Sequence, residues 1–358
     1  MHNSSLINKV LLTFTDGFKE YREDLSAVLL TEEKHLWFGS DETSTIERLS
    51  AIDGNNFGNH QRYRVGEFIQ LLASEEQEID IEGLSYTDYY LWLVGSHSYK
   101  RKKPKSKKSD EENATRLATI ATEPNRYILG RIPLVNGELF ASCPHPQNPD
   151  ILLTAAKLEQ TPTGNLLMTA LADDPHLGFF VKAAIPGKDN GFDIEGIVVY
   201  QNRIFLGLRG PVLRGWAVML EIELESSTPG MMTLRQIGSL GKRYKKHFIF
   251  LNGLGIRDMH LDGEDLLILA GPTMDLDGPV QLYRLPGGVN LPENMFHHPN
   301  CLQDIPYGNR IEHAEGFTLF QDITGIPSVL VVYDSPAKTR LVGDGGVMAD
   351  VFRLGVGG

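Results

Sequence analysis

The feature that most constrains the fold of this 358-residue chain is a unit that recurs along it. In its clearest copy, residues 192–212, an Asp-Ile-Glu-Gly motif opens an apolar stretch, a polar turn follows at 201–203, and a second apolar stretch ends in Leu-Gly-Leu-Arg-Gly-Pro. Two apolar stretches joined by a short polar turn predict a β-hairpin. Residues 80–97 match this copy closely, and further hairpins are expected at 23–41, 255–272 and 313–335.

The spacing of the units predicts a propeller. One acidic residue marks each copy, and these residues are Asp24, Glu82, Glu195, Asp258 and Glu315. Their successive separations are 58, 113, 63 and 57 residues. Because 113 is close to twice the others, a degenerate sixth unit is expected near residue 138, where the segment 131–141 has a turn in its middle.

A long regular period signals a repeat architecture, and strand–turn–strand units favour blades around a central channel. We therefore predict an all-β fold, a single six-bladed β-propeller spanning residues 1–358. An ordinary sandwich whose hairpins resemble one another by chance is the alternative. The N-terminal strand at 8–14 is expected to pair with the C-terminal run 346–354 in a shared blade.

An inserted loop at about 100–114 interrupts the repeat. Seven of the nine residues 100–108 are basic, and acidic residues follow at 110–112. Basic runs of this kind occur in nucleic-acid-binding and localisation segments. The net charge of −12 instead favours a solvated loop beside its own acidic run, and it argues against a nucleic-acid partner. The loop could also swing over the channel mouth and hold a small anionic ligand. A short helix is expected at 115–121.

The remaining composition predicts a cytoplasmic protein with no membrane partner. The two cysteines, Cys143 and Cys301, are too few for a disulfide framework. The first residues lack the basic and apolar regions of a signal peptide, and no apolar run approaches the length of a membrane-spanning helix.

The acidic positions predict a site. If each begins the innermost strand of a blade, the five carboxylates converge at one mouth of the channel, where they would repel one another unless a cation lies between them. Calcium or another hard divalent cation is the expected ion, since it accepts irregular cages of oxygen ligands. The predicted metal ligands are Glu82, Glu195, Asp258, Glu315 and Asp24, and the other predicted residues of the mouth are Asp41, Arg257 and Asp334.

Two alternatives to a metal remain open. In the first, the ring satisfies itself by pairing with Arg209, Arg257 and His97. In the second, each carboxylate only caps a turn by accepting backbone N–H bonds, and the propeller is an inert scaffold.

Arg209 and His97 follow the second strand of the two best-matched units, so both are expected to project from the rim. There they would recognise an anionic substrate, with Glu195, Arg209 and His97 as the catalytic residues. The competing expectation for Arg209 is an internal ion pair with Glu195 or a neighbouring glutamate. No Gly-x-Ser-x-Gly, Walker or His-Glu-x-x-His motif offers another catalytic signature.

Two motifs carry a family resemblance. Asp-Ile-Glu-Gly-Leu followed by Gly-Ser-His-Ser-x-Lys-Arg-Lys, at 80–102, and Asp-Ile-Glu-Gly-Ile followed by Gly-Leu-Arg-Gly-Pro-Val, at 193–212, resemble an uncharacterised bacterial family, domain of unknown function 3616. The resemblance implies a propeller-like β protein with no established activity. The chain is more loosely similar to phytase-like esterase and gluconolactonase-type propellers, which can hold a metal at a Glu-Gly in the first strand. It lacks their other motifs, so none of their catalytic residues is carried over.

Two functions are consistent with these residues. The first is a divalent-metal-assisted hydrolase of a phosphate or other ester, of esterase, phosphatase or lactonase type. The second is a non-catalytic platform that binds a ligand or a protein at the channel mouth.

Overall fold

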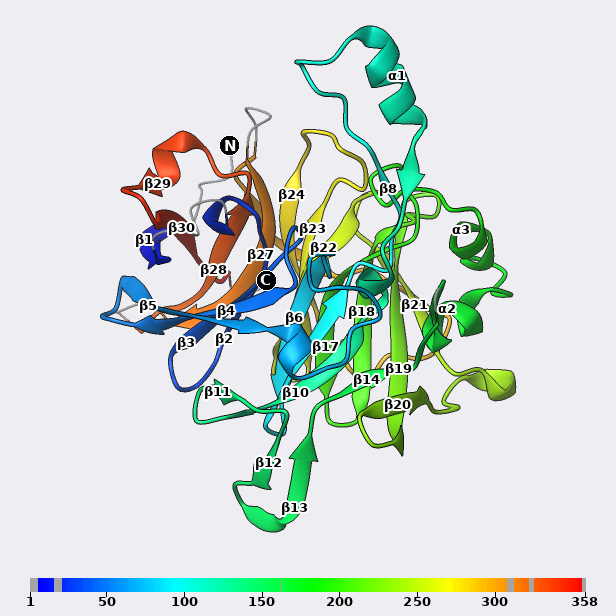
Figure 1. Cartoon of the computed structure of the whole chain (residues 1–358), viewed down its shortest axis with the longest axis horizontal. Coiled ribbons are helices and arrows are strands. Elements are labelled where there is room, and N and C mark those ends of the chain that lie inside the picture. Colours follow the sequence, from blue (N-terminus) through cyan, green and yellow to red (C-terminus); the bar gives the residue numbers. More distant parts are fainter. Residues whose placement is uncertain (1–5, 16–20, 162, 308–311, 322–324, 356–358) are drawn as a thin grey trace.

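Five antiparallel meanders of four strands make up the framework of the computed structural model (Figure 1), which describes residues 6–15, 21–161, 163–307, 312–321 and 325–355. The first meander contains β2 (Leu25–Leu30), β3 (His35–Ser40), β4 (Thr45–Ala51) and β5 (Asn56–Arg64). The second contains β6 (Ile81–Thr87), β7 (Tyr90–Gly95), β10 (Leu129–Val135) and β14 (Ala156–Leu158).

The third meander contains β17 (Asp193–Tyr200), β18 (Arg203–Gly210), β19 (Trp216–Thr228) and β21 (Lys245–Phe250). The fourth contains β22 (Gly255–Asp262), β23 (Asp265–Gly271), β24 (Val280–Leu285) and β26 (Asn300–Ile305). The fifth contains β27 (His313–Gln321), β28 (Pro327–Asp334), β30 (Gly346–Arg353) and β1 (Leu6–Thr13).

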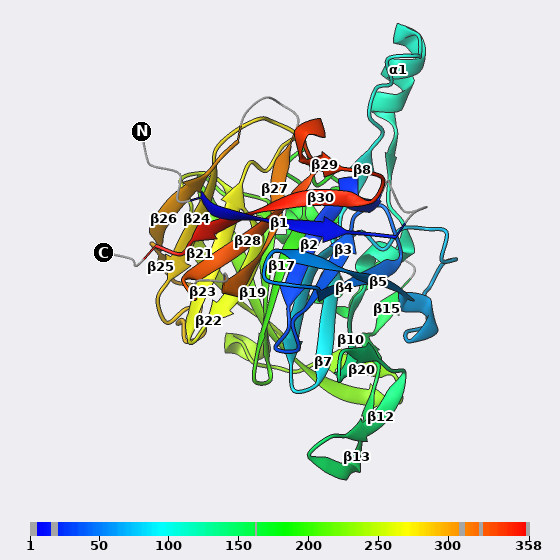
Figure 2. The same cartoon turned by 90° about the vertical axis from the view of Figure 1, so that its left-hand side faces the viewer.

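The first strands of the meanders close a ring. β2 packs against β6, β6 against β17, β17 against β22, β22 against β27, and β27 against β2. This is the arrangement of propeller blades around a central channel, so the all-β propeller prediction holds. The predicted clasp is also confirmed, because β1 pairs antiparallel with β30 and completes the fifth blade (Figure 2).

The prediction of a sixth blade near residue 138 is not confirmed, since the described strands form five blades. β10 pairs with β7 and β14, so it is the third strand of the second blade. The turn after β10 leads only into the two-residue strand β11 (Glu138–Leu139). The 113-residue separation is long because insertions enlarge the second blade.

The core lies between the blades, and it explains the continuous apolar runs of the inner strands. Residues 266–270 of β23 are buried throughout, because neighbouring blades cover both faces of the strand. Between the first two blades, Trp37 and Ile46 pack in one cluster with Leu84 and Leu91. Each of the buried aromatic and aliphatic side chains in this cluster contributes about 1.5–3 kcal/mol of transfer free energy.

Two of the insertions project from opposite ends of the molecule (Figure 1). The first is an arm formed by β8 (Lys100–Arg101), α1 (Asp110–Ala118) and β9 (Ile120–Ala121). Ser109 and Glu112 form a capping box at the start of α1, which therefore begins five residues before the predicted helix. The second is a hairpin of β12 (Ser142–His145) and β13 (Asn148–Thr154).

Shorter elements complete the described chain. They are β15 (Gln160–Thr161), β16 (Gly164–Asn165), α2 (Leu166–Leu171), α3 (Gly178–Lys182), β20 (Met231–Leu234), β25 (Phe296–His297) and β29 (Leu341–Val342). No described helix has the length and apolarity that crossing a membrane requires. Cys143 and Cys301 are both free thiols.

Candidate functional site

A β-bulge at the same place in every inner strand positions the residues of the channel mouth. The pairing of each inner strand with its neighbour skips one residue near the start. A bulge leaves the extra residue outside the ladder and redirects its side chain. The five bulge residues are Ser26, Glu82, Glu195, Arg257 and Glu315. Three of the five predicted carboxylates therefore occupy equivalent positions.

Asp258, a predicted metal ligand, lies one residue beyond the bulge and is directed away from the other carboxylates. It occupies the position held elsewhere by Gly83, Gly196 and Gly316. Its Oδ1 accepts from the Met259 N–H at 2.7 Å, and its Oδ2 accepts from the Phe317 N–H at 2.9 Å. Asp258 thus joins the fourth blade to the fifth, as in the alternative that a carboxylate caps the backbone.

Asp24 also falls outside the bulge position, two residues before Ser26. It forms an isolated antiparallel bridge with Asp334, another predicted residue of the mouth. The structure therefore keeps Asp24 near the rim, but on a different part of the strand from Glu82, Glu195 and Glu315.

Guanidinium groups neutralise two of the central carboxylates. Arg257 Nη1 lies 3.2 Å from Glu195 Oε2 and 2.7 Å from Glu315 Oε1. Arg209 Nη1 lies 2.5 Å from Glu195 Oε1 and 3.9 Å from Asp193. The predicted internal ion pair of Arg209 with Glu195 is thus present, and the side chain of Arg209 is buried rather than projecting from the rim.

This donor set does not fit a divalent cation. Arg257 lies between two of the predicted ligands, where its charge does what a metal ion would do. Within the described ranges, no group of three or more His, Cys, Asp or Glu residues could hold a metal ion. For Glu195 and Glu315 the arrangement matches the alternative in which the ring pairs with Arg209 and Arg257.

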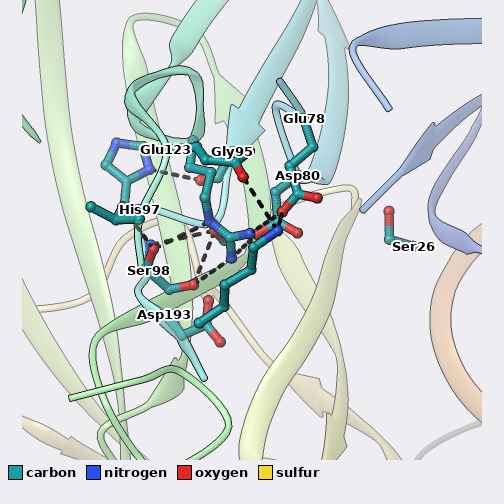
Figure 3. A network of polar contacts seen from close by, with 12 residues as sticks. Ser26, Glu78, Asp80, Gly95, His97, Ser98, Glu123 and Asp193 are labelled. Atoms are coloured by element: carbon teal, nitrogen blue, oxygen red, sulfur yellow. Dashed lines mark hydrogen bonds and ion pairs between the residues drawn. The ribbon is translucent and has the colours of Figure 1, made fainter. Parts of the chain in front are cut away.

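A second buried network surrounds Arg126 (Figure 3). Its guanidinium group forms an ion pair with Asp80, lies 2.6 Å from Glu78, and donates to the Ser98 hydroxyl at 2.8 Å. Lys100, at the base of the arm, also pairs with Glu78. Burial raises the pKa of Asp80 to about 6, although the charge of Arg126 acts in the opposite direction.

Glu82 differs from the other bulge glutamates. Its side chain is buried, and it has no hydrogen-bond or ion-pair partner among the described residues. Burial raises the pKa of Glu82 well above its usual range, and the charges of Asp80, Glu195 and Glu315 raise it further. Arg257, Lys188 and Arg209 have the opposite effect on Glu315, where they outweigh burial and lower the pKa. The surroundings therefore favour the protonated form of Glu82 and the ionised form of Glu315.

The rim adds further groups whose pKa values are raised. Burial and the charge of Glu315 raise the pKa of Asp334 to about 7, and burial and the charge of Asp334 raise that of Asp41. Burial alone would lower the pKa of Lys188, but Glu315, Asp41 and Asp334 raise it, so Lys188 stays charged. No hydrogen bond or ion pair joins Lys188 to another described residue.

The expectation that His97 projects from the rim is wrong. The side chain is 1% exposed, and its Nδ1 lies 2.7 Å from the Gly95 carbonyl oxygen. Its Nε2 lies 2.7 Å from the Asn165 amide nitrogen, which also donates to the Tyr127 carbonyl oxygen. Burial lowers the pKa of His97 to about 4, so the ring is neutral and serves the packing of the second blade.

Sequence reasoning missed four residues of the site, and only two of them carried a signal. Asp80 and Asp193 stand two positions before Glu82 and Glu195 in the repeated Asp-Ile-Glu-Gly motif. Burial and the charge of Glu195 raise the pKa of Asp193 to about 8. Arg126 comes from the segment between β7 and β10 of the second blade, and Lys188 from the segment between the second and third blades; no repeat identifies either.

Solved structures similar to this chain have low similarity scores. A streptogramin B lyase structure is 11% identical, covering 98% of this chain and 100% of its own, with a TM-score of 0.37. A mannose phosphorylase from Leishmania mexicana is also 11% identical, covering 98% and 89%, with a TM-score of 0.40. A putative glucose dehydrogenase from Thermus thermophilus is 12% identical, covering 96% and 100%, with a TM-score of 0.36.

No curated protein matches the sequence. A family model described as "Protein of unknown function (DUF3616)" matches residues 24–350, which is most of the chain.

Proposed function

We propose that this chain, which belongs to the DUF3616 family, binds a small polar molecule at the channel mouth and carries out acid–base chemistry on it. The observation that carries the proposal is Glu82, a buried carboxyl group without a partner in the described part of the chain, whose pKa is raised by burial and by neighbouring carboxylates. Groups with strongly shifted pKa values at the end of a channel are characteristic of proton donors and acceptors in active sites.

The charges at the mouth favour a neutral substrate over the small anionic ligand that the sequence suggested. Its carboxyl groups outnumber its four cationic groups, Arg126, Lys188, Arg209 and Arg257. Several of these carboxyl groups have raised pKa values, so the mouth carries little net charge and offers no excess of positive charge to hold a phosphate. Among the predicted hydrolase substrates, a neutral ester or lactone therefore fits the site best.

Hydrolysis of such an ester needs one proton donor, one proton acceptor and a partner for the carbonyl oxygen. Asp334, with a pKa of about 7, would take a proton from the attacking water as the new C–O bond forms. The Lys188 ammonium group would stabilise the charge on the carbonyl oxygen. Glu82 would protonate the leaving oxygen as its bond to the acyl carbon breaks.

The test is a screen of neutral acetate esters and lactones with the parent protein, Glu82→Gln and Glu264→Gln. Glu264 lies exposed in the turn between β22 and β23, so it is a matched control outside the mouth. Loss of a general acid lowers kcat/KM by roughly 10²–10⁴-fold, and Glu82→Gln should do so while Glu264→Gln does not. Equal activity of Glu82→Gln and the parent would overturn the role of Glu82.

The second candidate function is a non-catalytic ligand-binding platform. It is favoured by the mutual pairing of Arg209, Glu195, Arg257 and Glu315, which fixes a rigid polar surface without leaving a free nucleophile. Calorimetric binding of a lactone without turnover, abolished by Lys188→Met, would support this function over the first.

A further inference from the structure

A cavity lies at the other end of the strands from the channel mouth. It has a volume of about 860 Å³ and lies between the second and third blades, beside the hairpin turns at 87–90 and 200–203. Strands rise about 3.3 Å per residue, and Tyr86 and Thr87, which line the cavity, stand four and five residues after Glu82 in β6, so they lie roughly 13–17 Å from it along the strand. The two sites are therefore separate.

The walls of the cavity are mainly apolar and aromatic. Tyr86, Tyr90, Trp92 and Tyr200 line it together with aliphatic side chains, and Ile151 of the projecting β12–β13 hairpin forms part of its outer wall. Pockets of this size with apolar walls and a few fixed polar groups are typical sites for small organic ligands.

Arg131 is the polar group that defines the ligand. Its guanidinium carbon lies 4.3 Å from the centroid of the Tyr90 ring and 5.5 Å from that of Trp92, so two aromatic faces hold the group in place. The side chain of Arg131 forms no ion pair or hydrogen bond with another described residue, and its Nε is buried without an acceptor. A fixed, planar guanidinium group with unused N–H donors is suited to a carboxylate.

Trp92 supplies a second unused donor in the same wall. Its side chain is buried, 6% exposed, and its indole Nε1 has no hydrogen-bond partner among the described residues. A buried N–H group without an acceptor costs free energy comparable to a lost hydrogen bond. A bound oxygen acceptor would remove that cost for both Trp92 and Arg131.

The acidic residues that line the cavity do not supply an acceptor for Arg131. Asp88 and Glu225 are both exposed, and Glu225 lies 3.7 Å from Arg235. Neither forms an ion pair with Arg131.

We propose that this cavity binds a small organic anion, a carboxylate carried on a flat aromatic body. The carboxylate would accept from Arg131 and the Trp92 indole, and the aromatic body would pack among the tyrosine rings. The inference is independent of the chemistry proposed for the channel mouth.

The indole N–H of Trp92 provides a local readout. The chain has three tryptophans, so a ¹H–¹⁵N spectrum should contain three indole signals, and Trp92→Phe assigns the one of interest. Titration with 2-naphthoate should shift this signal. The dissociation constant from that titration should be at least tenfold lower than the one for 2-naphthalenemethanol, which has the same rings without the charge. An unmoved Trp92 signal at millimolar 2-naphthoate, or equal affinity for the two probes, would overturn the proposal.

Two arginine variants complete the test. Arg131→Gln should weaken the binding of 2-naphthoate at least tenfold and leave the binding of 2-naphthalenemethanol unchanged. Arg203→Gln is the matched control, because Arg203 also stacks on a tyrosine, Tyr200, but already donates to the Val289 carbonyl oxygen. If Arg131→Gln fails to fold, Arg131→Lys, which keeps the charge without the planar group, should still weaken 2-naphthoate. Equal losses in the Arg131 and Arg203 variants would contradict the assignment.

Discussion

Glu82 and Glu195 occupy the same bulge position in neighbouring blades, yet their surroundings demand opposite charge states. Glu195 accepts from Arg209 and Arg257, whereas Glu82 faces other carboxylates. Replacement of one partner in a buried ion pair costs about 3–5 kcal/mol. We expect Glu195→Gln to lower the free energy of unfolding by about that amount and Glu82→Gln to leave it unchanged or raise it. Urea unfolding at pH 7.5 measures both, and equal losses in the two variants would contradict the assigned charge states.

The contrast between these residues explains how far the sequence could identify the site. The Asp-Ile-Glu-Gly motif located Glu82 and Glu195 because the bulge and its glycine recur together. In the first and fourth units the search for an acidic residue selected Asp24 and Asp258, but the bulge residues there are Ser26 and Arg257. The surroundings of each carboxylate depend on Arg209 of the neighbouring strand and Arg257 of the next blade, so they could not be predicted from the Asp-Ile-Glu-Gly motif alone.

At the scale of single elements, the glycine after the bulge allows adjacent inner strands to approach closely. A Cβ atom on Gly316 would lie 3.1 Å from the Ser26 carbonyl oxygen and 3.2 Å from the Val28 nitrogen, both in β2. Gly316→Ala should therefore lower the free energy of unfolding by about 1–3 kcal/mol. Gly58→Ala is the control, because its Cβ would meet the tip of the exposed Ile52 side chain. Similar melting temperatures for the two variants would count against close packing at Gly316.

Element-level patterns predicted all five hairpins that begin the blades, because each combines two apolar strands with a polar turn. They failed on the blade count because the second blade carries the α1 arm and the β12–β13 hairpin between its strands. A long separation between two units can come from an insertion within a blade or from an additional degenerate blade, and the sequence spacing alone does not distinguish them. Only the pairing of β10 with β7 resolves the two.

At the scale of the whole molecule, the carboxyl groups with raised pKa values predict a stability that falls as pH rises from about 4 to about 8. The folded-state pKa of Asp193 is raised to about 8 and that of Asp334 to about 7, so the folded state binds protons that the unfolded state has already released. Stability from such groups is present at low pH and is lost as pH rises through the folded-state pKa. Each group contributes at most about 1.4 kcal/mol per pH unit.

We therefore expect the melting temperature to fall between pH 5 and 7.5, where the folded state still holds protons that the unfolded state has released, and Asp193→Asn to reduce this slope. Asp173→Asn, at an exposed position, is the control and should leave the slope unchanged. A slope that is flat in the parent, or identical in Asp193→Asn, would show that Asp193 is ionised in the folded protein.

The same network predicts the response to metal ions. Because Arg257 occupies the space between Glu195 and Glu315, we expect equal melting temperatures in millimolar calcium chloride and in EDTA. A ligand that binds only the folded state stabilises it in proportion to the logarithm of its concentration. A midpoint that rises steadily with calcium would restore the metal-assisted hydrolase as the leading function.

The pairing of β1 with β30 affects how this chain can fold during translation. Val10 and Leu12 of β1 are fully buried, and β1 reaches its partner only after residues 346–353 have been made. β1 also touches β5 of the first blade, through Leu11–Leu12 and Asn56–Phe57. During translation, β1 is made first but cannot pair with β30 until the end of the chain has been made. A nascent chain that has completed four blades therefore still exposes an apolar edge that a chaperone would recognise.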